Sequence, residues 1–176
     1  MNTLKKTALG LAFAAALPAI AATDGTLGNP STGDIAITLT IDDLVQISRL
    51  NDITFGAYAG SGNLTATEAF CVYRNGTGLY QVTLTGDSDG LGGPGTDFFV
   101  TSGANVLPYT VDYDDGSGAL AVTSATPVTT RQGHQTLPDC GVADNTSLTV
   151  TLLEADLQAA VAGAYAGTLT LVVAPE

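Results

Sequence analysis

Short stretches rich in β-branched and aromatic residues recur along this sequence, and residues that favour turns separate them. One of the most regular is GLYQVTLTG at 78–86, in which Tyr80, Val82 and Leu84 alternate with polar neighbours. Such alternation places one set of side chains on one face of a strand. Further stretches of this kind lie at 44–50, 52–58, 64–73, 97–102, 106–114, 119–128, 147–153 and 167–174. Many short strands at this spacing predict an all-β fold, an antiparallel β-sandwich.

One stretch near the end of the sequence breaks the strand pattern. Residues 153–162 are rich in Leu, Ala, Glu and Gln, which favour helix, and Gly163 follows them. The composition predicts a short helical insert between the last two strands, with Gly163 as its C-terminal stop.

The strictest alternation of all lies in GDIAITLTI at 33–41. Its large aliphatic side chains occupy every second position: Ile35, Ile37, Leu39 and Ile41. An extended strand with this pattern has to bury one face, either in its own sheet or in that of another molecule. Strands of this kind are common in complete sandwiches, so both interpretations stay open at this point.

The N-terminus has the features of an export signal. Lys5 and Lys6 precede an apolar run, and small residues at 19–21 suit a cleavage site. The run is too short to span a bilayer, so we expect no membrane insertion and a mature start near Ala22. The expected organisation is a signal peptide at 1–21, an N-terminal extension at 22–42 and one domain at 43–176.

The charge of the chain limits its partners. Without residues 1–21 the 176-residue chain keeps 155 residues, and loss of Lys5 and Lys6 changes the formal net charge from −12 to −14. Nucleic acid and anionic membrane surfaces repel such a chain, so neither is an expected partner.

The sequence contains two cysteines, Cys71 and Cys140. In an exported chain an even number of cysteines favours one disulfide, and free thiols or an intermolecular bridge are the alternatives. A closed loop of about 70 residues stabilises a fold by roughly 4 kcal/mol in the chain-entropy treatment.

Candidate residues for catalysis or metal binding are few. His134 is the one histidine, and its Gly-flanked polar surroundings predict a surface loop instead of a catalytic site. Carboxylates lie two residues apart at Asp87–Gly90 and at Asp112–Gly116, a spacing that suits calcium but also suits hairpin turns. Neither stretch completes an EF-hand loop, so we favour turns. We therefore predict no enzyme, no metal site and no cofactor.

Four segments, in this order, resemble a known family. They are LNDITFGAY, FCVYRNGTGLYQVTLTGD, NVLPYTVDYD and GAYAGTLTLVVAPE. Together they are similar to the segments of spore coat protein U domain proteins, the archaic (Csu-type) chaperone–usher pilins. Members of that family commonly carry a cysteine in the first strand, which this chain lacks.

The resemblance implies a fold and a function. Such pilins have an immunoglobulin-like sandwich that lacks its last strand, and the N-terminal extension of the next subunit completes it. A periplasmic chaperone and an outer-membrane usher mediate this donor-strand exchange. The resemblance thus implies a secreted structural subunit of a cell-surface pilus that contributes to attachment or biofilm, with neighbouring pilin subunits as partners. The donor residues would be Ile35, Ile37, Leu39 and Ile41; alternatively, residues 35–41 continue into the subunit's own first strand and the donor segment shifts toward Thr26–Ile37. Cys71 would pair with Cys140.

A function of a different class stays open. The chain could be a secreted monomeric β-sandwich that binds a glycan or calcium at its acidic loops. The two hypotheses differ in whether the chain is a stable monomer by itself.

Overall fold

The computed structural model describes residues 22–86 and 98–176. The predicted signal peptide and the acidic turn at Asp87–Gly90 lie outside these residues. The chain divides into two compact units, one that ends at Ile41 and one formed by Asp42–Glu176. In the described residues no helix is long and apolar enough to cross a membrane.

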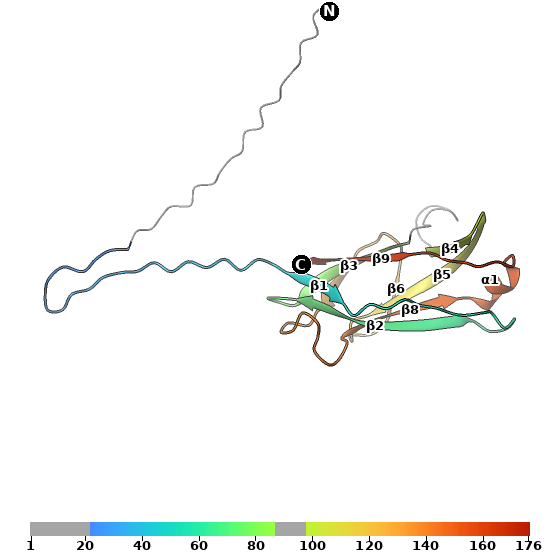
Figure 1. The fold of residues 1–176 in the computed structure, drawn as a ribbon, viewed down its shortest axis with the longest axis horizontal. Helices are drawn as coiled ribbons and strands as arrows, with labels where there is room; N and C mark the ends of the chain where they lie inside the picture. Colours follow the sequence, from blue (N-terminus) through green and yellow to red (C-terminus); the bar gives the residue numbers. More distant parts are fainter. Residues whose placement is uncertain (1–21, 87–97) are drawn as a thin grey trace, which may run out of the picture. The chain divides into compact units, whose positions relative to one another are not determined.

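Asp42–Glu176 folds as two antiparallel β-sheets, which confirms the predicted sandwich (Figure 1). The strands are β1 (Val45–Ser48), β2 (Leu64–Arg74), β3 (Leu79–Gly86), β4 (Phe98–Ser102), β5 (Asn105–Asp114), β6 (Leu120–Val122), β7 (Val128–Gln132), β8 (Thr146–Leu152) and β9 (Leu169–Pro175). The larger sheet has the order β1-β2-β8-β5-β4, with β6 beside β5, and the smaller has the order β7-β3-β9.

The core lies between these sheets and is built from the alternating residues of their strands. The inward residues of β3, namely Tyr80, Val82 and Leu84, are fully buried. The larger sheet supplies Phe70 and Tyr113, whose rings meet edge to face at 6.2 Å between centroids. The hydroxyl groups of Tyr80 and Tyr113 are hydrogen-bonded at 2.6 Å, so two buried polar atoms satisfy each other across the sandwich.

The prediction of a strand at 52–58 is wrong. The chain between β1 and β2 forms no strand, although Ile53 and Phe55 still pack, half-buried, against the core. Gly56, Gly60 and Gly62 have positive φ angles of 72°, 94° and 80°, which an extended strand does not accommodate. The apolar pattern therefore identified the buried side chains, whereas the glycines decided the backbone.

The single strand predicted at 119–128 is also wrong, because the structure has two strands there. β6 ends at Val122, and Ala125 has a φ angle of 56° in the turn that follows. β7 then extends to Gln132, into a segment that the sequence predicted as loop.

The helical insert is confirmed as α1 (Glu154–Ala159), but it is shorter than predicted. Its last residue is followed by Ala160 in an extended conformation, so Gly163 is not its stop. The side chain of Asn63 accepts a hydrogen bond from the N–H of Glu154 at 2.9 Å, which holds the start of the helix to the loop before β2.

Candidate functional site

The last strand, β9, has one open edge. It pairs with β3 along its whole length, from Leu169 opposite Gly86 to Pro175 opposite Tyr80. In the part of the chain that the structure describes, no strand pairs with its other side. An unpaired edge presents backbone N–H and C=O groups to which another strand can bind.

The inward side chains of β9 are incompletely covered. Leu169, Leu171 and Val173 pack against the core, yet all three are only half-buried. The inward residues of the neighbouring strand β3 are fully buried. Apolar surface therefore stays in contact with water along β9, which costs free energy until another apolar surface covers it.

Residues from other elements share this incomplete burial. β1 and β9 are in contact, although they belong to different sheets. Val45 and Ile47 of β1, and Tyr165 just before β9, pack half-buried against the core. The incompletely covered part of the core thus includes β9 and its neighbour β1.

Arg74 ties the end of β9 to the start of β1. One of its guanidinium nitrogens donates to the side chain of Asp43 at 3.2 Å and to the backbone oxygen of Glu176 at 2.9 Å. Its other terminal nitrogen donates to Asn75 and Thr77 at 2.6 and 3.0 Å. Arg74 is buried, and these contacts offset part of the desolvation of its charge, while its buried Nε has no hydrogen-bond partner in the described residues. Asp43 and the end of β9 therefore lie beside each other.

The segment before Asp42 is described by itself. The four aliphatic residues Ile35, Ile37, Leu39 and Ile41 are 81%, 91%, 83% and 77% exposed. Residues 35–41 form no strand in the structure, although their sequence has the strictest strand pattern in the chain. Their role as a donor strand stays a prediction.

A small hairpin precedes this segment. The backbones of Thr23 and Asp34 exchange two hydrogen bonds, at 3.0 and 2.9 Å, and close a polar loop between them. Gly33 lies at this closure, where an added Cβ would lie 3.0 Å from the backbone oxygen of Thr23. The exposed aliphatic segment therefore begins directly after a closed turn.

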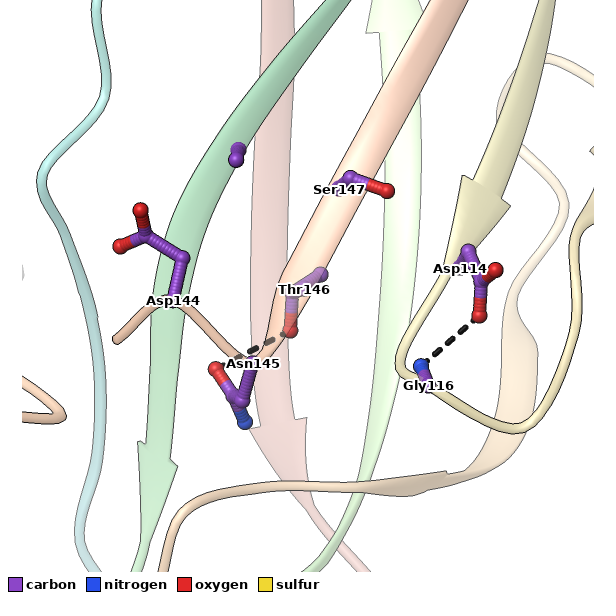
Figure 2. Close-up of a pocket in the computed structure, with 7 residues that line it drawn as sticks. Asp114, Gly116, Asp144, Asn145, Thr146 and Ser147 are labelled. Atoms are coloured by element: carbon purple, nitrogen blue, oxygen red, sulfur yellow. Dashed lines mark hydrogen bonds between the residues drawn. The ribbon is translucent and has the colours of Figure 1, made fainter.

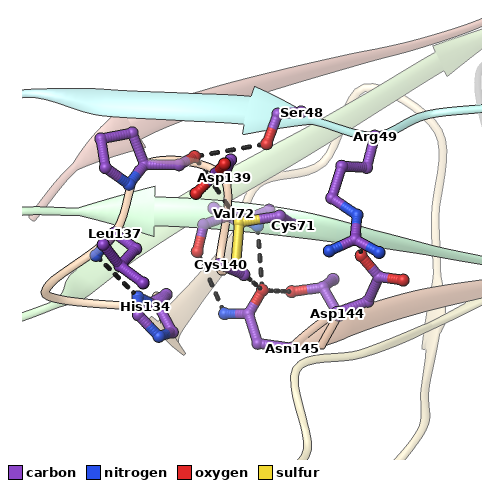
Figure 3. The surroundings of a disulfide bond; sticks show 12 residues. Ser48, Arg49, Cys71, Val72, His134, Leu137, Asp139, Cys140, Asp144 and Asn145 are labelled. Atoms are coloured by element: carbon purple, nitrogen blue, oxygen red, sulfur yellow. Dashed lines mark hydrogen bonds and ion pairs between the residues drawn. A yellow bond between two sulfur atoms is a disulfide. The ribbon is translucent and has the colours of Figure 1, made fainter. Parts of the chain in front are cut away.

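Cys71 and Cys140 form a disulfide with their Cα atoms 5.8 Å apart, the pairing that the sequence favours (Figure 3). Cys71 lies on β2, and Cys140 lies in the loop before β8. Asn145 supports this loop, because its side chain accepts from the N–H of Val72 at 2.9 Å and donates to the carbonyl of Val72 at 3.0 Å. The disulfide therefore fixes the loop between β7 and β8 onto β2.

His134 belongs to the same loop and has a structural contact. Its backbone pairs with β2 through bonds to Arg74 and Val72, at 3.0 and 2.8 Å. Its Nδ1 atom accepts a hydrogen bond from the N–H of Leu137 at 3.0 Å. The predicted surface loop is thus held against β2, and the imidazole stabilises a turn (Figure 3).

The acidic stretch at Asp112–Gly116 covers the end of β5 and the start of the turn that follows it. Asp114 accepts from the N–H groups of Gly116 and Gly118 at 2.8 and 3.0 Å, an arrangement that needs no metal ion. A surface pocket of about 240 Å³ lies beside it, with Asp144 and Asn145 at its wall (Figure 2). Among the described residues, no group of three His, Cys, Asp or Glu side chains is placed to hold a metal ion.

Asp115, in the same turn, is buried and has several partners. Burial by itself raises the pKa of a carboxyl group, but here the contacts outweigh it and the pKa of Asp115 lies below its ordinary value. Ser117 donates to it, Gln132 donates its N–H at 2.7 Å, and Arg131 lies 3.4 Å away. The burial of Asp115 and Arg74 could not be predicted from the sequence, because the spacing of a single charged residue gives no sign that it is buried.

Comparison with known proteins gives a likeness of fold. The sequence matches no model of a known protein family and no curated protein, so these comparisons do not support the resemblance to spore coat protein U domains. A solved structure, "Chaperone-tip adhesin complex is vital for synergistic activation of CFA/I fimbriae biogenesis", contains a chain with a TM-score of 0.53 and 16% identity. The match covers 75% of this chain and 42% of that one, so this chain spans less than half of that protein's length.

A second solved structure, the CupB6 tip adhesin from Pseudomonas aeruginosa, has 16% identity over 76% of this chain and 42% of that chain. Its TM-score of 0.30 adds no weight. The first likeness shows that the sandwich of this chain shares its fold with a chain of a fimbrial chaperone–tip adhesin complex.

Proposed function

We propose that this chain is a structural subunit of an extracellular pilus of the chaperone–usher type, which polymerises by donor-strand exchange. The extension at 22–42 would supply the donor strand, and the sandwich at 43–176 would accept one. The observation that carries this proposal is the match between an open strand edge with half-buried apolar residues and an exposed segment with four alternating aliphatic residues.

The free energies of burial and of ordering favour a donor strand that belongs to a whole subunit over a short free peptide. Burial of an aliphatic side chain contributes roughly 1.5–3 kcal/mol, and the backbone of β9 gains hydrogen bonds along its open edge. Ordering the donor costs ~1–2 kcal/mol per residue. Summed over a seven-residue strand, this cost is similar in size to the free energy gained by burying its four aliphatic side chains. A short peptide would therefore bind modestly, and a fibre would depend on slow release of its inserted strands.

The partners follow from the same proposal. A subunit with an exposed apolar edge aggregates unless a chaperone covers β9 before assembly, and an usher would then exchange the chaperone for the next subunit. The disulfide suits an oxidising compartment, consistent with export through the periplasm to a surface fibre. Attachment or biofilm formation would be a property of that fibre.

The test compares a chain that starts at Ala22 with one that starts at Asp43, each with and without a peptide of residues 24–42. We expect the longer chain to form heat-resistant polymers, and the shorter chain to be a weakly stable monomer. The peptide should raise the thermal midpoint of the shorter chain. A matched control peptide carries Ile37→Asp and Leu39→Asp and should have no effect.

The opposite outcome is equally clear. If the longer chain is a stable monomer and the peptide leaves the shorter one unchanged, the donor-strand proposal is wrong. A secreted monomeric binding module for a glycan or calcium then becomes the better hypothesis.

A further inference from the structure

We infer that residues 35–41 of one copy pair antiparallel with β9 of a second copy in one register, with Ile35 opposite Pro175 and Ile41 opposite Leu169. This inference rests on the proposed function and adds the register of the donor strand and the residues that fix it.

The two segments have matching lengths and patterns. Residues 35–41 carry aliphatic side chains at their first, third, fifth and seventh positions, and β9 carries its half-buried residues at the same positions of Leu169–Pro175. Pairing them end to end therefore aligns all four aliphatic residues with inward positions of β9. A slip by one residue would turn Ala36, Thr38 and Thr40 inward instead, so only slips by two residues need consideration.

A slip by two residues is unfavourable in either direction. In one direction Gly33 would replace Ile35 opposite Pro175, and Ile41 would extend beyond the strand. The hairpin closed by Thr23 and Asp34 would also have to open, because Gly33 lies at its closure.

In the other direction, Asp43 would lie opposite Leu169. That slip would bury a carboxylate among apolar residues and would remove it from Arg74 of its own copy. The hairpin at one end and Asp43 at the other therefore limit the donor to one register.

In this antiparallel direction, the donor strand has to come from a second copy of the chain. Arg74 holds Asp43 beside Glu176, at the C-terminal end of β9. Leu169 lies at the opposite end, roughly 20 Å away for a strand of this length. Two residues of chain span at most about 7 Å, so Ile41 of the same copy cannot reach its own Leu169.

Antiparallel pairing also agrees with the rest of the fold. All the strand pairs described in the structure are antiparallel, and β9 is antiparallel to β3. Antiparallel ladders are slightly more stable per residue than parallel ones, and sheets of one kind are favoured over mixed ones.

The test uses disulfide cross-linking between two full-length variants. The donor carries Ala36→Cys, and three separate acceptors carry Ala174→Cys, Val172→Cys or Thr170→Cys. The proposed register places Ala36 opposite Ala174. The slip that brings Gly33 opposite Pro175 places it opposite Val172, and a parallel strand places it opposite Thr170.

We expect about tenfold more covalent dimer with Ala174→Cys than with either other acceptor, because a slip loses the burial of one aliphatic side chain. Non-reducing gels measure the dimer, and mass spectrometry of the cross-linked peptide identifies the two cysteines. Each single-cysteine variant by itself is the control for rearrangement of the native disulfide.

A second variant tests what fixes the register. Gly33→Val crowds the closure of the hairpin and weakens it, because its Cβ would lie 3.0 Å from the backbone oxygen of Thr23, and it adds an aliphatic residue at the next inward position. With this change the slipped register also buries four aliphatic residues, so the cross-link of Ala36→Cys to Val172→Cys should become comparable in amount to that with Ala174→Cys. Gly28→Val, in the same hairpin but outside the inward series, should leave the cross-link at Ala174→Cys.

The outcomes separate this inference from the proposed function. Cross-linking mainly to Val172→Cys or Thr170→Cys in the unaltered donor overturns the register or the direction, while strand exchange stands. Polymers without any of the three cross-links overturn the register as well. Chains that stay monomeric in all mixtures overturn both proposals.

Discussion

Strands β8 and β9 have similar sequences, TSLTVTL and LTLVVAP, but their inward side chains differ in burial. In β8, Leu148, Val150 and Leu152 are 4%, 7% and 6% exposed. In β9, the corresponding inward residues are half-buried. β8 lies between β2 and β5, whereas β9 pairs, among the residues that the structure describes, with β3 alone.

Position at a sheet edge does not by itself explain this difference. β4 also ends its sheet, yet its Phe98 is buried and stacks on Tyr109 of β5 at 5.5 Å between ring centroids. The alternating pattern thus determines which face of a strand points inward, and neighbouring elements determine whether that face is covered. The inward face of β9 is incompletely covered, as is that of its neighbour β1.

The largest expected effect is the difference in unfolding free energy lost by Leu148→Ala and by Leu171→Ala. Leu148→Ala should lower the free energy of unfolding by roughly 2–5 kcal/mol, because it leaves a cavity in a closed core. Leu171→Ala should cost about half as much in the isolated subunit, because water already reaches its side chain. Urea denaturation of the chain that starts at Asp43 measures both.

Addition of the donor peptide sharpens the same comparison. Once a peptide of residues 24–42 covers β9, the cost of Leu171→Ala should approach that of Leu148→Ala, while the latter changes little. Equal costs for the two variants in the free subunit would mean that β9 is as well covered as β8 and that the core is not open there.

Much of the fold was predictable because alternation survives in individual strands. Tyr80, Val82 and Leu84 read as one face of a strand in the sequence, and the structure buries all three. β7 escaped prediction because VTTRQ has one apolar residue, and Thr130 within it has a φ angle of 59°. Backbone contacts to β3 and to distant side chains hold it in the sheet, and no local pattern encodes these.

The candidate site was less predictable than the fold. The sequence of residues 35–41 predicts a strand but does not specify its partner, and β9 reads as an ordinary strand. The open edge results from the absence of a neighbour, which depends on the course of the whole chain. The contact of Arg74 with Asp43 and Glu176 is equally non-local, since it joins residues 31 and 102 positions apart from it.

A smaller effect is expected for two carboxylates that accept from backbone N–H groups of β7. Asp115 is buried and accepts from Gln132 at 2.7 Å, while Glu176, after β9, is exposed and accepts from Thr130 at 2.9 Å. At pH 7, Asp115→Asn should lower the unfolding free energy by about 1–3 kcal/mol. Glu176→Gln should change it by less than about 0.5 kcal/mol.

The pH dependence of the unfolding free energy distinguishes Asp115 further from Glu176. Because the folded state lowers the pKa of Asp115, this group stabilises the fold above the ordinary value of 3.8 and loses that effect as the pH falls through its folded-state pKa. The gap between the unaltered chain and Asp115→Asn, measured by urea denaturation, should therefore narrow from pH 7 to pH 3. A gap that stays constant would show that the carboxylate charge contributes nothing at this position.

The smallest expected effect concerns the outward faces of strands β8 and β9. Thr149 of β8 is hydrogen-bonded to Thr67 of β2 at 2.8 Å, whereas Val172 of β9 is 58% exposed at the open edge. Thr149→Ala should lower the unfolding free energy by about 0.2–1 kcal/mol, the usual range for a cross-strand pair. Val172→Ala should have a smaller effect in the isolated subunit, because Val172 is largely exposed and its cross-strand neighbour in the described residues, Thr83 of β3, lies on one side only.

Pairing with a donor strand would change the cost of Val172→Ala and leave that of Thr149→Ala unchanged. A donor strand beside β9 gives Val172 a second outward neighbour, so Val172→Ala should then cost as much as an ordinary cross-strand pair, while the cost of Thr149→Ala stays constant. Paired urea denaturation curves of the two variants, with and without the peptide of residues 24–42, measure this difference. An equal change in both variants would indicate a general stabilisation by the peptide and would contradict insertion beside β9.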